Sequence, residues 1–441
     1  MNADQNPSAG TGAALKPPPP ALFRWVVLVV ISLAMFGNYY VYDAISPLAD
    51  LLRDQLGLSD SRIGMLNAIY SFPNIIMVLV GGIIIDRIGV KKGTLLFGAL
   101  CFIGAVVTAA TDRFVVMAAG RLIFGIGAES LIVSVTVGIA RWFKGRELSF
   151  AFGVNLTIAR LGTYLALRSP TWARGAYENW QWPLLITVAF ATFCVVGPLI
   201  YWVLENRAER CYDLGETGET EKVEWSDLFS FGRSYIWVVL LCVTFYSAIF
   251  PFQTFAIKFF QDTHGVSRET AGALSGMITL FSMICTPLFG LWVDRVGRRS
   301  LFMMIGSLML VPVYLMMAYT SVDLKIPMAI MGIAFSLVPA VMWPSVAYLV
   351  QEAKLGTAYG LMTMIQNIGL FGFNLMIGRA NDLSAASATN PGGYALGMWI
   401  FSILGLLGFF FAFMLRREEM GPHSHGLETI TVKSTREAEG H

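Results

Sequence analysis

Two charged side chains lie in the middle of long apolar stretches, where a charge is costly and therefore informative. Glu129 sits near the centre of the stretch 115–140, and Arg160 near the centre of the stretch 147–168. Charged groups at membrane depth normally face a partner or a cavity. The guanidinium of Arg160 needs an acceptor, either Glu129 on the neighbouring segment or the carboxylate of a bound molecule. A purely structural ion pair stays open as an alternative.

Arg121 lies eight residues before Glu129 in the same stretch. At the helical rise per residue the two positions share roughly one face and stand about 12 Å apart. We predict a conformational role for Arg121, with an anchor between helices as the alternative.

The first apolar stretch, 23–46, ends with tyrosines and one acid, Tyr40 and Asp43 among them. Asp43 could be an outer gate, a proton site or a ligand for an amine, or it could simply hydrogen-bond at a helix end. Tyr40 and Asn155, which precedes Arg160 by five positions, are further candidate ligands.

Polar and aromatic side chains also interrupt the apolar stretches of the second half. They are either cavity lining or packing between helices. The candidates for substrate binding are Gln253, Trp343 and Gln366, and Asn367 and Asn374 belong to the same group.

The composition indicates that all these residues belong to a membrane protein. The chain has 441 residues, of which 56% are hydrophobic and 14% charged, whereas soluble domains carry about 25% charged residues. The net charge of +2 and the lack of basic clusters with aromatics exclude nucleic acid as a partner. The five cysteines form no CxxC pair. No metal-ligand spacing, nucleophile–base arrangement or phosphate loop is present, so we expect no metal, no cofactor and no enzyme.

About twenty apolar residues cross a bilayer. On that basis we predict six spans, near 23–46, 62–85, 93–111, 115–140, 147–168 and 182–204, and six more, near 236–259, 269–292, 300–319, 326–349, 357–378 and 394–415. The expected fold is an all-α polytopic membrane protein of twelve transmembrane helices. Its predicted parts are a disordered tail (1–21), a six-helix bundle (22–204), a linker (205–235) with a short surface helix near 224–229, a second six-helix bundle (236–416) and a disordered tail (417–441).

One loop motif occurs in both halves, and this repeat indicates two six-helix bundles related by pseudo-twofold symmetry. The pattern G-x-x-x-D-R-x-G-x-(K/R) begins at Gly82 and again at Gly290. Matching halves with a charged hinge are typical of transporters that rock between two open states. In each copy the acid could pair with a basic residue of the other bundle and the glycine could permit a tight turn. The predicted gating residues are Asp86, Arg87, Gly89, Asp294, Arg295 and Gly297, together with Arg121.

The distribution of Lys and Arg sets the predicted orientation. Basic residues favour one side of the short loops by about two to one, which places both termini, the linker and both repeated motifs in the cytoplasm.

The repeated motif and the sequence GRxxxGxG at 120–127 make residues 22–416 resemble the major facilitator superfamily. Longer strings in both halves are similar to its lysosomal dipeptide transporter family and that family's prokaryotic relatives. These strings are IYSFPN (69–74), GRLIFGIGAES (120–130), WFKGREL (142–148), ARLG (159–162), LGTAYG (355–360) and QNIG (366–369).

This resemblance implies dipeptide transport, by uniport in the animal members, with Arg160 at the peptide carboxylate and Glu129 at its ammonium group. A departure from the pattern is Arg168, which adds a positive charge toward the outer vestibule. The alternative is a proton-coupled importer of small organic anions, and a receptor of the same fold is a further one. The tails show no acidic dileucine signal, and the sequon at Asn155 lies within a span. We therefore expect a multi-pass protein of a prokaryotic plasma membrane, with the lysosomal membrane as the alternative. We expect the lipid bilayer and a small substrate as partners, and no obligate protein partner.

Overall fold

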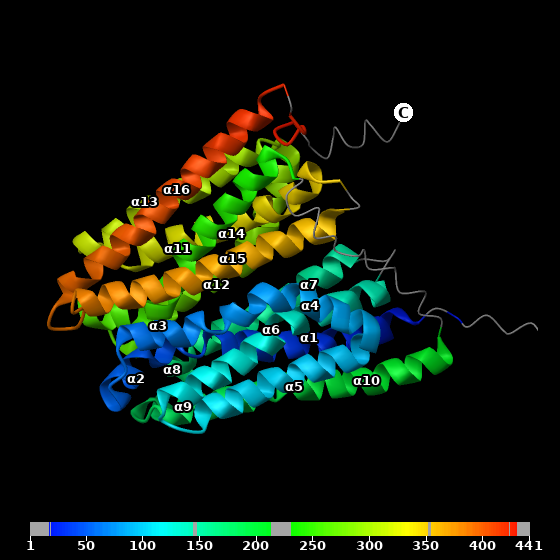
Figure 1. Ribbon diagram of the computed structural model, residues 1–441, viewed down its shortest axis with the longest axis horizontal. Helices are drawn as coiled ribbons and strands as arrows, with labels where there is room; N and C mark the ends of the chain where they lie inside the picture. The colour runs from blue at the N-terminus through cyan, green and yellow to red at the C-terminus, as the bar shows by residue number, and fades with distance from the viewer. Residues whose placement is uncertain are drawn as a thin grey trace, which may run out of the picture.

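The computed structural model describes residues 17, 19–143, 148–212, 231–351, 354–422 and 424–429, without the side chains of a few of them, Asp86 included. These residues form long helices that run side by side (Figure 1). Helices satisfy every backbone hydrogen bond within one segment, which is what an apolar chain needs in lipid. The predicted all-α class is therefore confirmed.

The first half contains the helices α1 to α10. Their bounds are α1 Ala21–Asp43, α2 Ala49–Leu56, α3 Asp60–Ala68, α4 Ser71–Ile88, α5 Val90–Ala109, α6 Phe114–Phe143, α7 Leu148–Leu167, α8 Ser169–Trp172, α9 Gln181–Ala191 and α10 Phe193–Cys211, with the short 3-10 turns η1 Ser46–Leu48 and η2 Arg174–Glu178.

The second half contains the helices α11 to α16. Their bounds are α11 Arg233–His264, α12 Arg268–Val296, α13 Arg299–Tyr319, α14 Lys325–Leu349, α15 Leu355–Leu383 and α16 Ala395–Glu419, with the 3-10 turn η5 Pro391–Tyr394 before α16.

Among the described residues, eleven helical segments are long and apolar enough to cross a membrane. The predicted span 62–85 is not one of the eleven. Helices α3 and α4 together cover this stretch, and a turn at Ile69 and Tyr70 separates them. The matching helix of the second half, α12, has no such break. Serine caps mark the correspondence, because Ser59 begins α3 and Ser267 begins α12, at the same offset of 208 positions (267 − 59) as the motif repeat (294 − 86).

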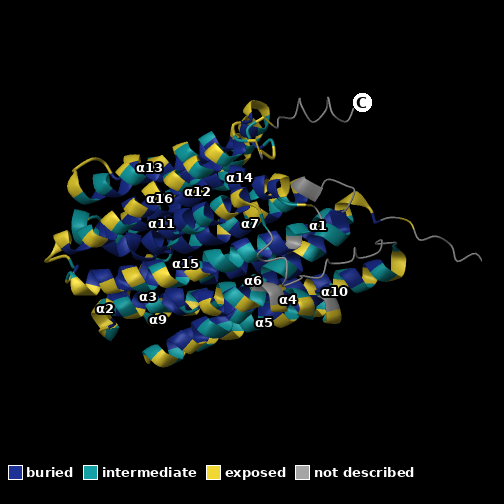
Figure 2. Ribbon diagram, turned by 45° about the horizontal axis from the view of Figure 1, so that its top comes forward, coloured by how far each residue is buried: buried dark blue, intermediate teal, exposed yellow. Residues whose placement is uncertain are grey.

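The two halves have largely separate apolar cores. One cluster of buried side chains lies entirely in the first half, from Val27 to Ala208. The other holds the second half together and also takes in first-half residues, from Ile45 to Leu66 and further on at Ala109, Met117, Ala118, Tyr177 and Leu184. Many other large apolar side chains are exposed over the outer surface, as the yellow segments of Figure 2 illustrate, and in a membrane they face lipid.

Both the start of α1 and the end of α16 lie at one end of the bundle, which we call the terminal end (Figure 1). The helices α2, α3, α8 and α9 lie at the opposite, distal end. The predicted orientation puts the terminal end in the cytoplasm.

The regions predicted as linker and tail are partly folded. Helix α10 continues to Cys211, and Glu205, placed in the solvated linker by the sequence, is fully buried and paired with Arg141 of α6. Beyond α16, Leu427 is fully buried in the second core, so the prediction of a disordered tail is wrong for this part. The rest of the linker, including 224–229, and the outer parts of both tails lie outside the described residues.

Candidate functional site

A cavity of about 640 Å³ lies between the two halves. Its walls come from α1, α6 and α7 of the first half and from α11, α12, α14 and α15 of the second. This volume is typical of a site for a small organic molecule, which runs from about 300 to 1,000 Å³.

Arg160 of α7 lines this cavity. Helix α7 packs tightly against α1 at Gly162. A Cβ atom at this position would collide with the Phe36 carbonyl oxygen, so the glycine is what permits this close approach. The guanidinium lies over two aromatic rings, 5.2 Å from the centroid of Phe335 and 5.8 Å from that of Tyr39. Its Nε is buried without a hydrogen-bond partner among the described residues. Aromatic walls thus hold the side chain at the cavity, and no acceptor among the described residues satisfies its Nε.

Glu129 of α6 lines the same cavity, beside Asn367 of α15. Among the described residues no ion pair joins Glu129 to Arg160 or to any other cation. Tyr39 lies close enough to interact electrostatically with both Arg160 and Glu129. The cavity therefore presents a separated positive and negative group, and the alternative of a purely structural ion pair does not describe this arrangement.

Asp43, at the end of α1, is a third charged residue in the cavity wall and is 8% exposed. Its neighbours are Thr163, Arg160 and Arg121. It also borders a second, polar cavity of about 10 Å³ on the distal side, together with Asn67 and Gln253. That space is about the least that can hold one water molecule.

Trp343 and Gln366 also line the large cavity, as the sequence predicted. The indole of Trp343 donates to the Tyr246 hydroxyl at 2.9 Å. The Gln366 amide oxygen accepts a weak bond from the Cys242 thiol at 3.6 Å. Two further predicted residues, Asn155 and Gln253, do not line this cavity. Asn155 accepts from the Ser32 hydroxyl at 2.9 Å between α7 and α1.

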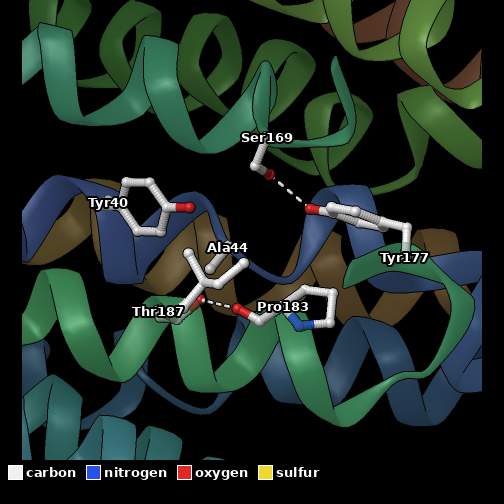
Figure 3. Close-up of a pocket in the computed structure, with 7 residues that line it drawn as sticks. Tyr40, Ala44, Ser169, Tyr177, Pro183 and Thr187 are labelled. Carbon is white, nitrogen blue, oxygen red and sulfur yellow. Dashed lines mark hydrogen bonds between the residues drawn. The ribbon is translucent and has the colours of Figure 1, made fainter. Parts of the chain in front are cut away.

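Tyr40, another predicted ligand, points away from the cavity. Its ring stacks on Phe190 of α9, with centroids 4.0 Å apart. Figure 3 shows its hydroxyl in a small pocket near Ser169 and Tyr177, which share a hydrogen bond of 2.5 Å. That pocket has no room for a water-sized ligand.

Tyr39 occupies the cavity in place of Tyr40, and the sequence contained a signal for it. The helical spacing i, i+4 puts Tyr39 with Asp43 and Asn38 with Tyr42, and all four line the cavity. Tyr246 and Phe335 carried no comparable signal, since they come from two helices of the other half.

Arg121 is fully engaged by the protein. It donates to the carbonyl oxygens of Leu66, Val41 and Tyr42 at 3.0, 2.9 and 3.2 Å, and to the Asn67 amide oxygen at 3.1 Å. It joins α6 to α1 and α3, and it does not line the cavity with Glu129. The structure therefore favours the anchor between helices.

The repeated loops form tight turns at glycines with positive φ, 81° at Gly89 and 71° at Gly297. In the second loop, Asp294 pairs with Arg299 of its own half at 2.9 Å, whereas the prediction paired it with the other bundle. Arg87 and Arg295 are exposed. The side chain of Asp86 lies outside the description.

The distal end is held closed by ion pairs between the halves. Lys258 of α11 binds Asp60 of α3 at 2.5 Å, and Arg268 binds Asp50 at 2.5 Å. The large cavity is bordered on that side by Tyr42, Tyr70 and Phe250, which also border the small polar cavity. In the other direction its lining reaches Gly153 and Gly290, near the terminal ends of α7 and α12.

A family model described as Major Facilitator Superfamily matches residues 31–373. The chain is 32% identical over 377 residues to the lysosomal dipeptide transporter MFSD1 of Danio rerio, covering 82% of this chain and 81% of that protein. It is 32% identical over 397 residues to MFSD1 of Homo sapiens, covering 86% and 85%. A solved bacterial homologue of the human lysosomal transporter Spinster, inward-facing and unoccupied, has a TM-score of 0.75 at 17% identity, covering 90% of this chain and 98% of that one. At that identity the last likeness concerns the fold alone.

Proposed function

The chain belongs to the major facilitator superfamily and is a multi-pass membrane transporter, and we propose that it carries dipeptides across the membrane by alternating access. One observation carries the choice of substrate. Arg160 and Glu129 line one cavity without pairing to each other, and a zwitterion has one charge for each of them.

We propose that the two groups select peptides over single amino acids. Buried charges are stabilised only when each meets an opposite charge or a hydrogen-bond donor or acceptor. The ammonium and carboxylate groups of a dipeptide are a peptide unit apart, whereas those of an amino acid share one carbon atom. The amine of the peptide would meet Glu129 and its carboxylate would meet Arg160. The names of the MFSD1 relatives support the same substrate class.

The arrangement of the halves supports alternating access as the mode of transport. The distal end is joined by ion pairs, while the cavity lining extends toward the terminal end. Pseudo-symmetric halves can exchange these roles by rocking around a central site. We propose uniport, because a zwitterion needs no further ion for charge balance at this pair of groups. The relatives are lysosomal by name, and a prokaryotic plasma membrane remains our sequence-based expectation for this chain.

The experiment is a binding and transport screen on purified protein. Dipeptides, N-acetylated dipeptides, single amino acids, tripeptides and small organic acids are compared by thermal shift, since a ligand of the folded state raises the melting temperature. Ligands that bind are then tested by counterflow in liposomes. We expect dipeptides alone to bind and to exchange without a proton gradient.

Two outcomes would overturn this proposal. Equal stabilisation by N-acetylated dipeptides or by organic acids would show that Glu129 does not recognise an amine, and would favour the proton-coupled importer of organic anions. Binding of dipeptides without any counterflow would favour a receptor.

A further inference from the structure

Helix α3 belongs to the first half by sequence, yet its first turn is bound by the second half. The Asp60 carboxylate accepts from the Lys258 ammonium at 2.5 and 2.6 Å, and the two side chains are 3% and 0% exposed. Both carboxylate oxygens of Asp382, at the end of α15, accept from the backbone N–H groups of Asp60 and Ser61 at 2.8 Å. A side chain of one half therefore caps a helix of the other.

The backbones of α3 and α15 also touch, and two glycines make this contact possible. A Cβ atom on Gly64 would lie 2.5 Å from the Asn374 carbonyl oxygen, and one on Gly378 would lie 2.5 Å from the Asp60 carbonyl oxygen. Figures 1 and 2 both show α3 alongside α15 at the distal end. Closer to the cavity, the Asn67 amide donates to the Thr254 hydroxyl at 3.1 Å, so the contact between the two halves extends in that direction.

Helix α3 is separated from α4 by the turn at Ile69 and Tyr70, and Tyr70 lines the large cavity. The corresponding helix of the second half, α12, is continuous. The break therefore lies in a segment that joins the cavity to the contact between the halves.

We propose that Asp60, Lys258 and Asp382 form a latch that closes the distal end and must separate each time the transporter opens there. We call these three residues the α3 latch. This inference rests on the alternating access proposed above and names the contact that controls it.

The chemistry of a buried ion pair suits a reversible latch. Its Coulomb attraction in the closed state is offset by the cost of removing both charges from water, so the net stabilisation is small. When the distal end opens, water hydrates both ions again. Removing one partner has a different effect, because it leaves an uncompensated buried charge that only opening can hydrate.

An exposed ion pair at the same end provides a matched control. Arg174 of η2 binds Glu269 of α12 at 2.8 Å and also joins the halves, but the Arg174 side chain is 82% exposed. Exposed ion pairs contribute little. This pair should not control the distal gate.

The test measures access to a buried reporter from the distal side. All five native cysteines are replaced, and a single cysteine is placed at Ser46, which is 4% exposed and borders the small polar cavity. A membrane-impermeant methanethiosulfonate reagent is applied outside right-side-out vesicles. We expect Lys258→Met to raise the labelling rate by about tenfold or more, and Arg174→Ala to leave it unchanged.

A second pair of variants separates the latch from general damage. Asp60→Leu combined with Lys258→Met removes both charges. Neither position then carries a charge that is hydrated when the distal end opens, so labelling should return to the slow rate and counterflow should also slow. Gly378→Ala keeps every charge but forces α3 away from α15. The reporter cysteine should therefore label quickly in this variant. This variant serves as the test if Lys258→Met does not fold.

The outcomes distinguish this inference from the proposed function. If Lys258→Met and Gly378→Ala fold, transport dipeptides and label no faster than the parent, the latch is wrong and alternating access is untouched. If the labelling pattern is as expected but the parent moves no dipeptide, the latch stands and the substrate proposal fails.

Discussion

Replacing Arg160 by alanine should weaken dipeptide binding by roughly 30- to 4,000-fold. Removing one partner of a buried, hydrogen-bonded charge pair costs about 2–5 kcal/mol, which corresponds to roughly 30- to 4,000-fold in Kd. The environment of Arg160 supports a value well above the surface range, because its Nε is buried and two rings flank the guanidinium. Arg160→Lys keeps the charge without the planar donor fork, and should lose about 1.5–3 kcal/mol.

The assay is a cycle that crosses the protein variant with a ligand variant. A dipeptide and its C-terminal amide are titrated into the parent and into Arg160→Ala by calorimetry. The amide lacks the carboxylate, so it should bind the parent weakly and lose little more in the variant. The control is Arg168→Ala, since Arg168 lies at the distal end and does not line the cavity.

A direct contact between Arg160 and the substrate carboxylate is refuted if the amide and the free acid lose the same affinity on Arg160→Ala. Such a result would mean that Arg160 acts on the protein and not on the substrate carboxylate. A loss of equal size in Arg168→Ala would point to long-range electrostatics instead of direct contact.

Three further predictions concern neighbouring features. Tyr39 lines the cavity and Tyr40 does not, so Tyr39→Phe should weaken dipeptide binding by roughly tenfold, as expected when a hydroxyl that faces the ligand is removed, while Tyr40→Phe should leave Kd unchanged. Arg121→Lys should lower the melting temperature in detergent without changing the relative affinities for ligands, because several buried carbonyl oxygens lose their donor. Truncation after residue 421 removes the fully buried Leu427 and should destabilise the fold by about 2 kcal/mol or more, as measured by thermal melting.

Each of these has a contrary result. Equal effects at Tyr39 and Tyr40 would contradict the orientation of α1. Altered ligand preference in Arg121→Lys would restore a direct role in the site. An unchanged melting temperature on truncation would mean that the terminal segment adds no stability.

The predicted spans came close to the helices because lipid imposes a simple rule. A stretch of about twenty apolar residues must form a helix to satisfy its backbone groups. The main difference, the α3–α4 break, falls in the string IYSFPN, which contains no glycine and only one proline. The folded linker residue Glu205 was missed because its acidity suggests solvent, whereas the ion pair with Arg141 makes its burial possible.

The sequence by itself determined the membrane, the twofold repeat, the two central charges Arg160 and Glu129, and part of the cavity lining. These features depend on residue type and on short spacings along one helix, which a linear pattern carries. Only the tertiary structure decided which face of α1 meets the cavity, that Arg121 is an anchor, and that Asp60 meets Lys258, 198 positions away. Contacts of that kind depend on how helices from two separate halves pack together, and no local periodicity encodes that packing.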